Sequence, residues 1–347
     1  MKDFQLINEN GYTFRYRKAN NSSTKNILFV HGFAVTSEYH DDYVEKFFDE
    51  YNYYAIELPG HGYAKLKHVT QLDPIFYAKY VSDFIKLKGF EDLVLIGHSM
   101  GGGIVLMVTN LVPNQLKKAV VVTPMNSSVW FSFKGLNSLK LLPDSVEKNW
   151  KYKNILVHEP NKHYSGVEDQ IIKKEIEYLS LHMKDFKILR KKMMSWKLHS
   201  ELKNSEENNS VQTLLILGRH DKVISCNSTS KRFENLDNYQ TVIFENSAHL
   251  PFMEETNDYV NLVLDFADND AFDVSNYSQS EIVDESNTGQ VNVEENQYEQ
   301  AEQADQYEQD YQDTEVVIET DQYNQDNYIQ QEEQNIDDSN NSTDGEQ

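Results

Sequence analysis

The chain of 347 residues has a single cysteine and no long apolar run, and each of these shortages excludes a class of protein. One thiol, Cys226, cannot form an intramolecular disulfide, which excludes a disulfide-stabilised scaffold and suits a reducing compartment. No run approaches the roughly 18 apolar residues that a membrane helix needs, and residues 1–10 lack the apolar core of a signal peptide. We therefore expect a cytoplasmic protein without a transmembrane segment.

Metal-ligand patterns are also missing. The eleven histidines are not spaced with the cysteine or with one another as metal ligands are. His158 and His163 are expected to be polar surface residues. We accordingly expect no metal and no cofactor.

Basic residues are absent from the C-terminal part of the chain. From Asp268 to Gln347 there are 24 acidic residues and no lysine or arginine, so the formal net charge of −24 lies wholly in this stretch. Gln, Asn, Asp, Glu, Ser and Tyr dominate it, and it holds too few apolar residues to offset the entropy of ordering. We predict a disordered acidic tail over 268–347. Its charge repels phosphate, so no nucleic-acid partner is expected.

Residues 93–104 have the pattern of a buried strand, a sharp turn and a helix start, with Ser99 at the apex of the turn. Such a turn lifts the serine hydroxyl clear of the sheet and tolerates only small residues two positions away, here Gly97 and Gly101. The N–H groups of the following helix point towards the serine. The alternative is a glycine-rich turn with an incidental serine, but the flanking strand and helix favour a nucleophile.

Short apolar runs alternate with segments of helical spacing along the rest of the chain. A hairpin around Asn10-Gly11 begins it. The expected strands are 26–30, 53–58, 93–98, 118–123, 213–218 and 241–244, and the expected helices include 38–51, 74–88 and 256–267. Strands that alternate with helices predict an α/β fold with a mainly parallel sheet covered on both faces.

Two of these strands are followed by polar residues that complete a catalytic set. Asp221 comes after strand 213–218, and His249 comes after strand 241–244. The carboxyl ends of parallel strands share one edge of the sheet, so Ser99, Asp221 and His249 can meet there. A neutral His249 would take the proton of Ser99, and Asp221 would fix its tautomer. Taken singly, Asp221 could instead be a turn residue and His249 a surface loop residue.

The motifs as a set resemble those of the α/β-hydrolase superfamily, in the group of monoacylglycerol lipases and lysophospholipase-like esterases. They are His31-Gly32-Phe33, Pro59-Gly60-His61-Gly62, Gly97-His98-Ser99-Met100-Gly101-Gly102, Gly218-Arg219-His220-Asp221 and Ser247-Ala248-His249. The resemblance implies that the backbone N–H groups of Phe33 and Met100 form the oxyanion hole. Glu57 stands where relatives more often have aspartate, and Ala64 where they often have serine.

Residues 127–210 interrupt the alternation of strands and helices, and in the resembled group an insert at this place is a cap over the nucleophile. We predict a hydrolase core over 1–126 and 211–267 with this cap between its parts. All three tryptophans, Trp130, Trp150 and Trp196, fall in the insert. They either line an apolar acyl pocket or only attach the cap to the core.

We predict a serine hydrolase that cleaves carboxylic esters of the lipase, esterase or lysophospholipase type through an acyl-enzyme. The substrate is expected to be a small ester with an apolar acyl chain. Thioesters and amides stay open, because pocket shape decides among them. The alternative is an interaction protein whose acidic tail binds a basic partner and whose hydrolase activity is secondary.

Overall fold

Eight strands in the described part of the chain form one sheet, in the order β1-β2-β4-β3-β5-β6-β7-β8. The computed structural model describes residues 4–9, 11–19, 23–44, 50–128, 142–167 and 169–277. The strands are β1 (Phe4–Glu9), β2 (Tyr12–Ala19), β3 (Asn26–Val30), β4 (Asn52–Glu57), β5 (Leu93–His98), β6 (Leu116–Val122), β7 (Thr213–Gly218) and β8 (Tyr239–Phe244).

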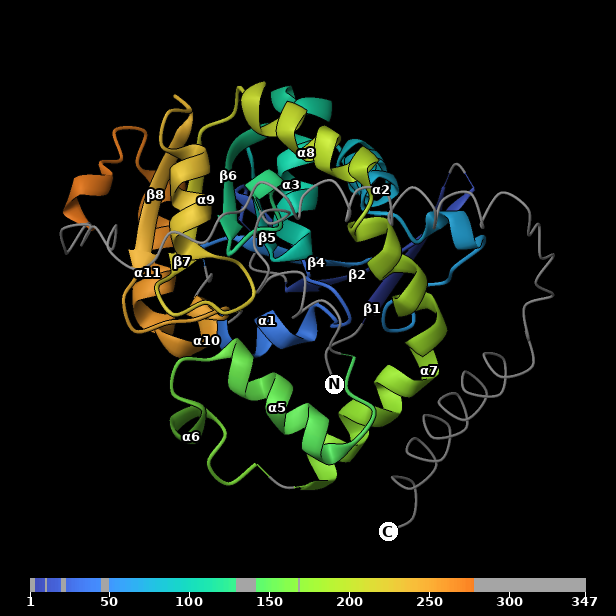
Figure 1. Ribbon diagram of the computed structural model, residues 1–347. Helices are drawn as coiled ribbons and strands as arrows, with labels where there is room; N and C mark the ends of the chain where they lie inside the picture. The colour runs from blue at the N-terminus through green and yellow to red at the C-terminus, as the bar shows by residue number, and fades with distance from the viewer. Residues whose placement is uncertain are drawn as a thin grey trace, which may run out of the picture. The chain divides into compact units, whose positions relative to one another are not determined.

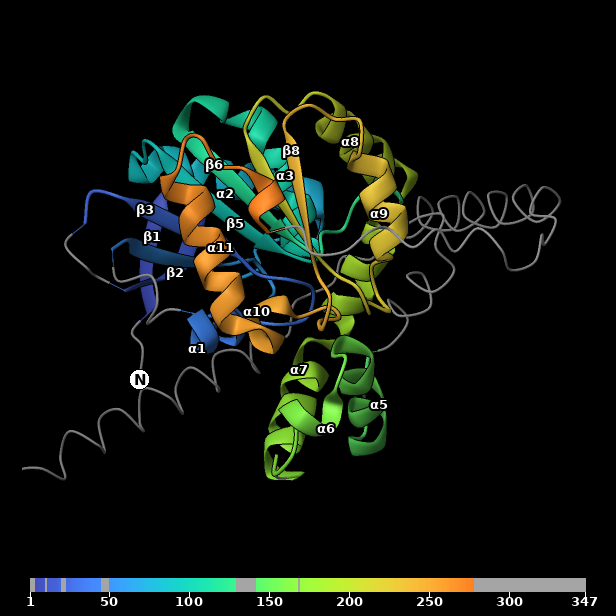
Figure 2. The ribbon, with the colours of Figure 1, turned by 90° about the vertical axis from the view of Figure 1, so that its left-hand side faces the viewer.

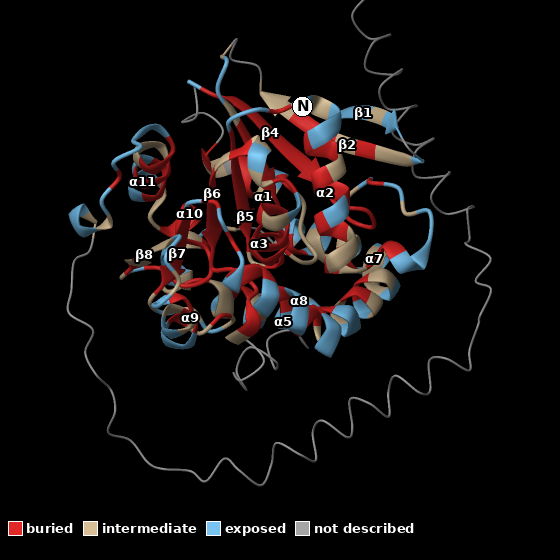
Figure 3. Ribbon diagram, turned by 90° about the horizontal axis from the view of Figure 1, so that it is seen from above, coloured by how far each residue is buried: buried red, intermediate tan, exposed pale blue. Residues whose placement is uncertain are grey.

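The six strands β4, β3, β5, β6, β7 and β8 are parallel. The pairs β1–β2 and β2–β4 are antiparallel, so β2 alone runs opposite to the rest of the sheet. The central strands β4, β5 and β7 are buried along their whole length, as unbroken apolar runs in a parallel sheet require. Figure 3 shows these strands in the buried interior. The predicted α/β sheet and its N-terminal hairpin are therefore confirmed.

Helices cover both faces of this sheet (Figures 1 and 2). On one face, α2 (Pro74–Lys88), α3 (Met100–Leu111), α8 (Trp196–Glu207) and α9 (Cys226–Phe233) share a core with the sheet. On the other face, α1 (Glu38–Val44), α10 (Pro251–Glu254) and α11 (Thr256–Asp268) contribute to a second core. The predicted helix 74–88 begins at the Asp73 cap and ends at Gly89, which has a left-handed backbone.

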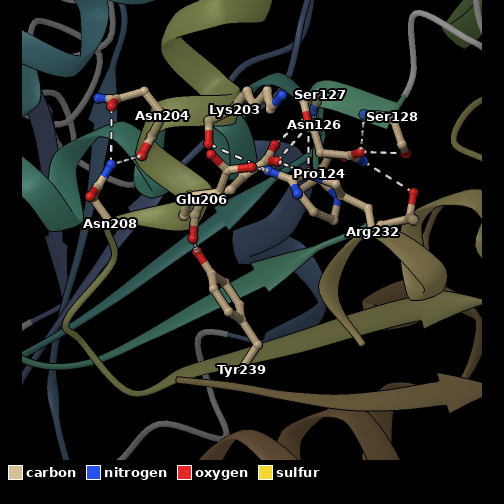
Figure 4. Close-up of polar contacts among 12 residues, drawn as sticks. Pro124, Asn126, Ser127, Ser128, Lys203, Asn204, Glu206, Asn208, Arg232 and Tyr239 are labelled. Carbon is tan, nitrogen blue, oxygen red and sulfur yellow. Dashed lines mark hydrogen bonds and ion pairs between the residues drawn. The ribbon is translucent and has the colours of Figure 1, made fainter. Parts of the chain in front are cut away.

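The predicted insert holds α5 (Val146–Leu156), α6 (Pro160–His163), α7 (Asp169–Met193) and α8. A polar cluster joins its two ends to the core (Figure 4). The buried carboxylate of Glu206, at the end of α8, accepts bonds from the Ser127 N–H at 2.7 Å and from Arg232 Nε on α9 at 2.6 Å. The Ser127 hydroxyl donates to the same carboxylate. Both ends of the insert are thus tied to one side chain.

The predicted tail is described only as far as Tyr277. In this part, Phe272 packs against Phe266 of α11, and the Tyr277 hydroxyl donates to Asp265 at 2.9 Å. Residues 278–347 lie outside the described residues, so the prediction of a basic partner for the tail stays a prediction. Residues 129–141, which include Trp130, also lie outside them.

Candidate active site

Ser99 sits in the turn between β5 and α3, with φ 55° and ψ −118°. Few side chains adopt a positive φ, and its occurrence at a serine marks a strained turn. A Cβ at Gly97 would lie 2.4 Å from the Gly101 oxygen, and one at Gly101 would lie 2.1 Å from the Val30 oxygen. Both glycines are therefore required by close backbone contact, as the sequence predicts.

The structure brings Ser99, His249 and Asp221 together. His249 Nε2 lies 3.0 Å from Ser99 Oγ, and His249 Nδ1 lies 2.8 Å from Asp221 Oδ2. The side chains of His249 and Asp221 are 5% and 0% exposed. The three residues follow β5, β8 and β7, whose parallel register carries their carboxyl ends to one edge.

Asp221 is held by its own loop. Its Oδ1 accepts the backbone N–H groups of Val223 at 2.7 Å and Ile224 at 2.9 Å, which leaves Oδ2 for the imidazole. Because these bonds fix the carboxylate, its second oxygen has one direction in which to accept. Since a carboxylate oxygen only accepts hydrogen bonds, this contact places the proton of His249 on Nδ1.

His98 is a neighbour whose part the sequence analysis did not foresee. Its Nε2 lies 2.9 Å from the backbone oxygen of His249, which also accepts the Thr123 hydroxyl at 3.1 Å. Burial lowers the pKa of His98 well below its usual value, with the nearby His249 as a further cause. A neutral ring that donates from Nε2 fits this contact, so His98 helps to hold the backbone of His249.

The turn at Gly32-Phe33 lies against Ser99, since a Cβ at Gly32 would be 3.3 Å from Ser99 Cβ. His31 braces this turn from inside. Its Nε2 accepts the Leu58 N–H at 3.0 Å, so its Nδ1, 2.8 Å from the Gly32 oxygen, carries the proton. The turn that would present the Phe33 N–H is thus tied to the loop after β4.

The buried His31 should make the free energy of unfolding depend on pH, which tests its assignment as a neutral ring. Burial lowers its pKa to about 4. A histidine that is neutral when folded contributes stability that is full above pH 6.5 or so and is lost as the pH falls towards 4. We expect His31→Gln to lower the slope of unfolding free energy against pH between 5 and 6 by about 1.2 kcal/mol per pH unit, because nearly one proton separates the two states there. Urea unfolding measures this slope. An unchanged slope in His31→Gln would contradict the assignment.

Apolar side chains reach this edge from α7. The Phe186 ring lies 5.6 Å from that of Phe33 and 5.0 Å from that of His61. On the same helix, the Tyr178 hydroxyl accepts the Gly62 N–H at 3.1 Å. Neither residue could be identified from the sequence, because helical spacing shows that α7 has an apolar face but not which loop this face contacts.

The two described tryptophans, Trp150 and Trp196, are not found in these contacts with Phe33 and His61. Trp196 is 72% exposed at the start of α8, and Trp150 packs edge-on against Tyr164, also within the insert. Trp196 is therefore too exposed to line a closed acyl pocket. Phe186, which belongs to the same insert, does lie beside Phe33.

Neither a metal site nor a membrane helix is found in the described part of the chain. No group of three or more His, Cys, Asp or Glu side chains there could hold a metal ion. No helix among the same residues is long and apolar enough to cross a membrane.

Comparison with known proteins gives consistent matches. Residues 21–256 match the family described as "Serine aminopeptidase, S33". The chain is 25% identical over 263 residues to "Putative esterase/lipase 1" of Mycoplasma pneumoniae, covering 74% of this chain and 96% of the relative. It is 22% identical to the monoacylglycerol lipase ABHD6 of Rattus norvegicus over 76% of this chain and 80% of that protein.

Solved structures share the fold. A serine hydrolase of Cycloclasticus zankles has a TM-score of 0.66 at 20% identity, and the match covers 79% of this chain and all of that one. The family match spans more than half of the chain and includes both β5 and the loop of His249. The chain therefore belongs to the serine aminopeptidase S33 family of hydrolases, within the α/β-hydrolase superfamily.

Proposed function

We propose that this hydrolase cleaves carboxylic esters with Ser99 as the nucleophile, His249 as the general base and Asp221 as the residue that orients it. The observation that carries the proposal is the pair of contacts at 3.0 and 2.8 Å, which links the three side chains in series. The strained backbone of Ser99 supports it, because strain of this kind gathers at functional sites.

The proposed reaction is a series of proton transfers through His249. His249 Nε2 accepts the hydroxyl proton as Ser99 Oγ attacks the ester carbonyl, and the resulting tetrahedral intermediate carries an oxyanion. His249 then gives the proton to the departing alcohol, which leaves an acyl ester on Ser99. Water, deprotonated by the same ring, releases the acid and restores the hydroxyl. Asp221 stabilises the imidazolium in both halves.

The oxyanion is proposed to bind the N–H groups of Phe33 and Met100. Met100 is the first residue of α3, and the free N–H groups at a helix N-terminus favour negative charge. The Gly32-Phe33 turn reaches the same place from β3 and is held there by His31. Fixed donors of this kind stabilise charge without reorganising during the reaction.

We propose that residues 127–210 cap a core made of 1–126 and 211–267, and that the acyl group lies beside Phe186. The names of the relatives, an esterase/lipase and a monoacylglycerol lipase, fit an ester with an apolar acyl chain. Phe186 and Phe33 would supply apolar surface for this chain close to Ser99.

A panel of esters of rising acyl length tests this proposal. Each buried methylene contributes about 0.8 kcal/mol, so kcat/KM should rise about fourfold per methylene from acetate until the pocket is full. Trp196→Ala is the matched control, because this exposed side chain should not alter the profile. An optimum at acetate would contradict an apolar acyl pocket. A wild-type protein that hydrolyses none of the esters would contradict the proposed esterase activity.

A further inference from the structure

The loops that carry Asp221 and His249 both contact the end of α5. We call Asn154–His158 the α5 terminal segment. The His249 N–H donates to the Leu156 oxygen at 2.9 Å, and Lys222 Nζ donates to the Asn154 oxygen at 3.4 Å. Figure 1 shows this end of α5 next to α10. The backbone of the proposed general base is therefore bonded to the insert as well as to the core.

Glu254 joins the same two parts through its carboxylate. Its Oε1 accepts the N–H of Ala248 at 2.8 Å, and its Oε2 accepts the N–H of His158 at 2.6 Å. The residue is the last of α10 and is 8% exposed. Hydrogen bonds to an ionised acceptor are about twice as strong as neutral ones. The bond from Ala248 is buried, and the bond from His158 is partly buried.

The α5 terminal segment packs against the core. Val157 is fully buried in the same core as Leu250 and Phe252, which flank the start of α10. The His158 ring stacks on that of His220, with centroids 3.6 Å apart, and His220 directly precedes Asp221. The segment thus contacts both loops of the proposed triad.

From these contacts we propose that Glu254 is a positioning residue for His249, which makes the geometry of the base depend on the docked insert. The inference rests on the proposed function of His249. Ala248 precedes His249, so the carboxylate holds the loop one residue before the base, while His98 and Leu156 hold the base itself. Without the carboxylate, the Ala248 and His158 N–H groups lose their common acceptor.

A small displacement of the imidazole has a large effect on rate. The ring must meet both Ser99 Oγ and Asp221 Oδ2, and a shift of about 1 Å can cost on the order of a hundredfold. The contacts of the Glu254 carboxylate described above are with backbone N–H groups. None of them is with Ser99 or with Phe33 and Phe186, where the ester is proposed to bind. Loss of the carboxylate should therefore alter kcat and leave KM almost unchanged.

Glu254→Gln tests the carboxylate at nearly constant size. A glutamine offers one acceptor oxygen, so its amide group would face the second N–H with another donor. Active sites are counted with a fluorophosphonate, and kcat per labelled site is measured with the best ester of the panel. We expect a fall of roughly tenfold to a hundredfold with KM within about twofold. Asp258→Asn, which removes an exposed carboxylate from α11, should match the wild type.

The link to the insert is tested at His158. His158→Pro removes the N–H that Glu254 accepts, and His158→Ala keeps it while removing the stacked ring. Val157 has φ −124° and ψ 153°, the extended backbone that proline favours before it. We expect kcat per site to fall further in His158→Pro than in His158→Ala.

The outcomes separate the two proposals. An inert wild-type protein contradicts the proposed function and overturns with it the inference about Glu254, which rests on that function. An active wild type with unchanged kcat per site in Glu254→Gln overturns the inference, as does equal kcat in the two His158 variants. A fall in the number of labelled sites with constant kcat per site would show a purely structural role and also overturn it.

Discussion

Replacement of Ser99 by alanine is expected to reduce ester hydrolysis by roughly a million-fold, the loss typical when one member of a catalytic unit is removed. The change deletes the only atom that forms the acyl-enzyme in the proposed mechanism. It leaves the turn intact, because alanine has the same Cβ and the crowding there involves Gly97 and Gly101 instead. The melting temperature should therefore stay close to that of the wild type.

The measurement is the initial rate with the best ester of the panel, together with labelling by a fluorophosphonate. Ser99→Ala should be inactive and unlabelled. Ser228→Ala, which removes an exposed hydroxyl from α9, should keep full activity and labelling. Full activity in Ser99→Ala would show that another nucleophile acts.

The meeting of Ser99, Asp221 and His249 could be predicted because a simple topological rule governs it. Ser99 and Asp221 follow fully buried apolar strands, His249 follows the half-buried edge strand β8, and parallel strands end at one edge of the sheet. The spacing in the chain, more than a hundred residues between Ser99 and Asp221, does not matter once the strands are recognised. Local patterns were sufficient here because the sheet does the positioning.

The contacts from the insert could not be predicted in the same way. Phe186 and Leu156 lie on helices whose spacing reveals an inner face, but no rule says which loop of the core that face meets. Trp196 shows that a tryptophan in the insert need not line a pocket, since its side chain is 72% exposed, whereas Trp130 lies outside the described residues and its part stays a prediction. No sequence pattern indicated Glu254 either. Its proposed role depends on the N–H groups of Ala248 and His158, which are far apart in the sequence.

Asp221→Asn is expected to lower kcat by about ten-thousandfold, although it changes a single oxygen to nitrogen. The Oδ1 atom accepts two backbone N–H groups, so an asparagine would keep its oxygen there and turn its amide nitrogen to His249. That nitrogen donates, and His249 Nδ1 would have to accept. The imidazole would then carry its proton on Nε2.

A proton on Nε2 faces Ser99 Oγ, so the ring could no longer take the proton of the nucleophile. The loss therefore comes from the wrong tautomer and not from a lost fold, and the variant should unfold at nearly the wild-type temperature. Steady-state kinetics on the ester panel measures the effect, with the exposed Asp237→Asn as the matched control. A loss of less than about tenfold would mean that Asp221 does not set the tautomer, since the two bonds to Oδ1 leave the asparagine no other orientation that satisfies its loop.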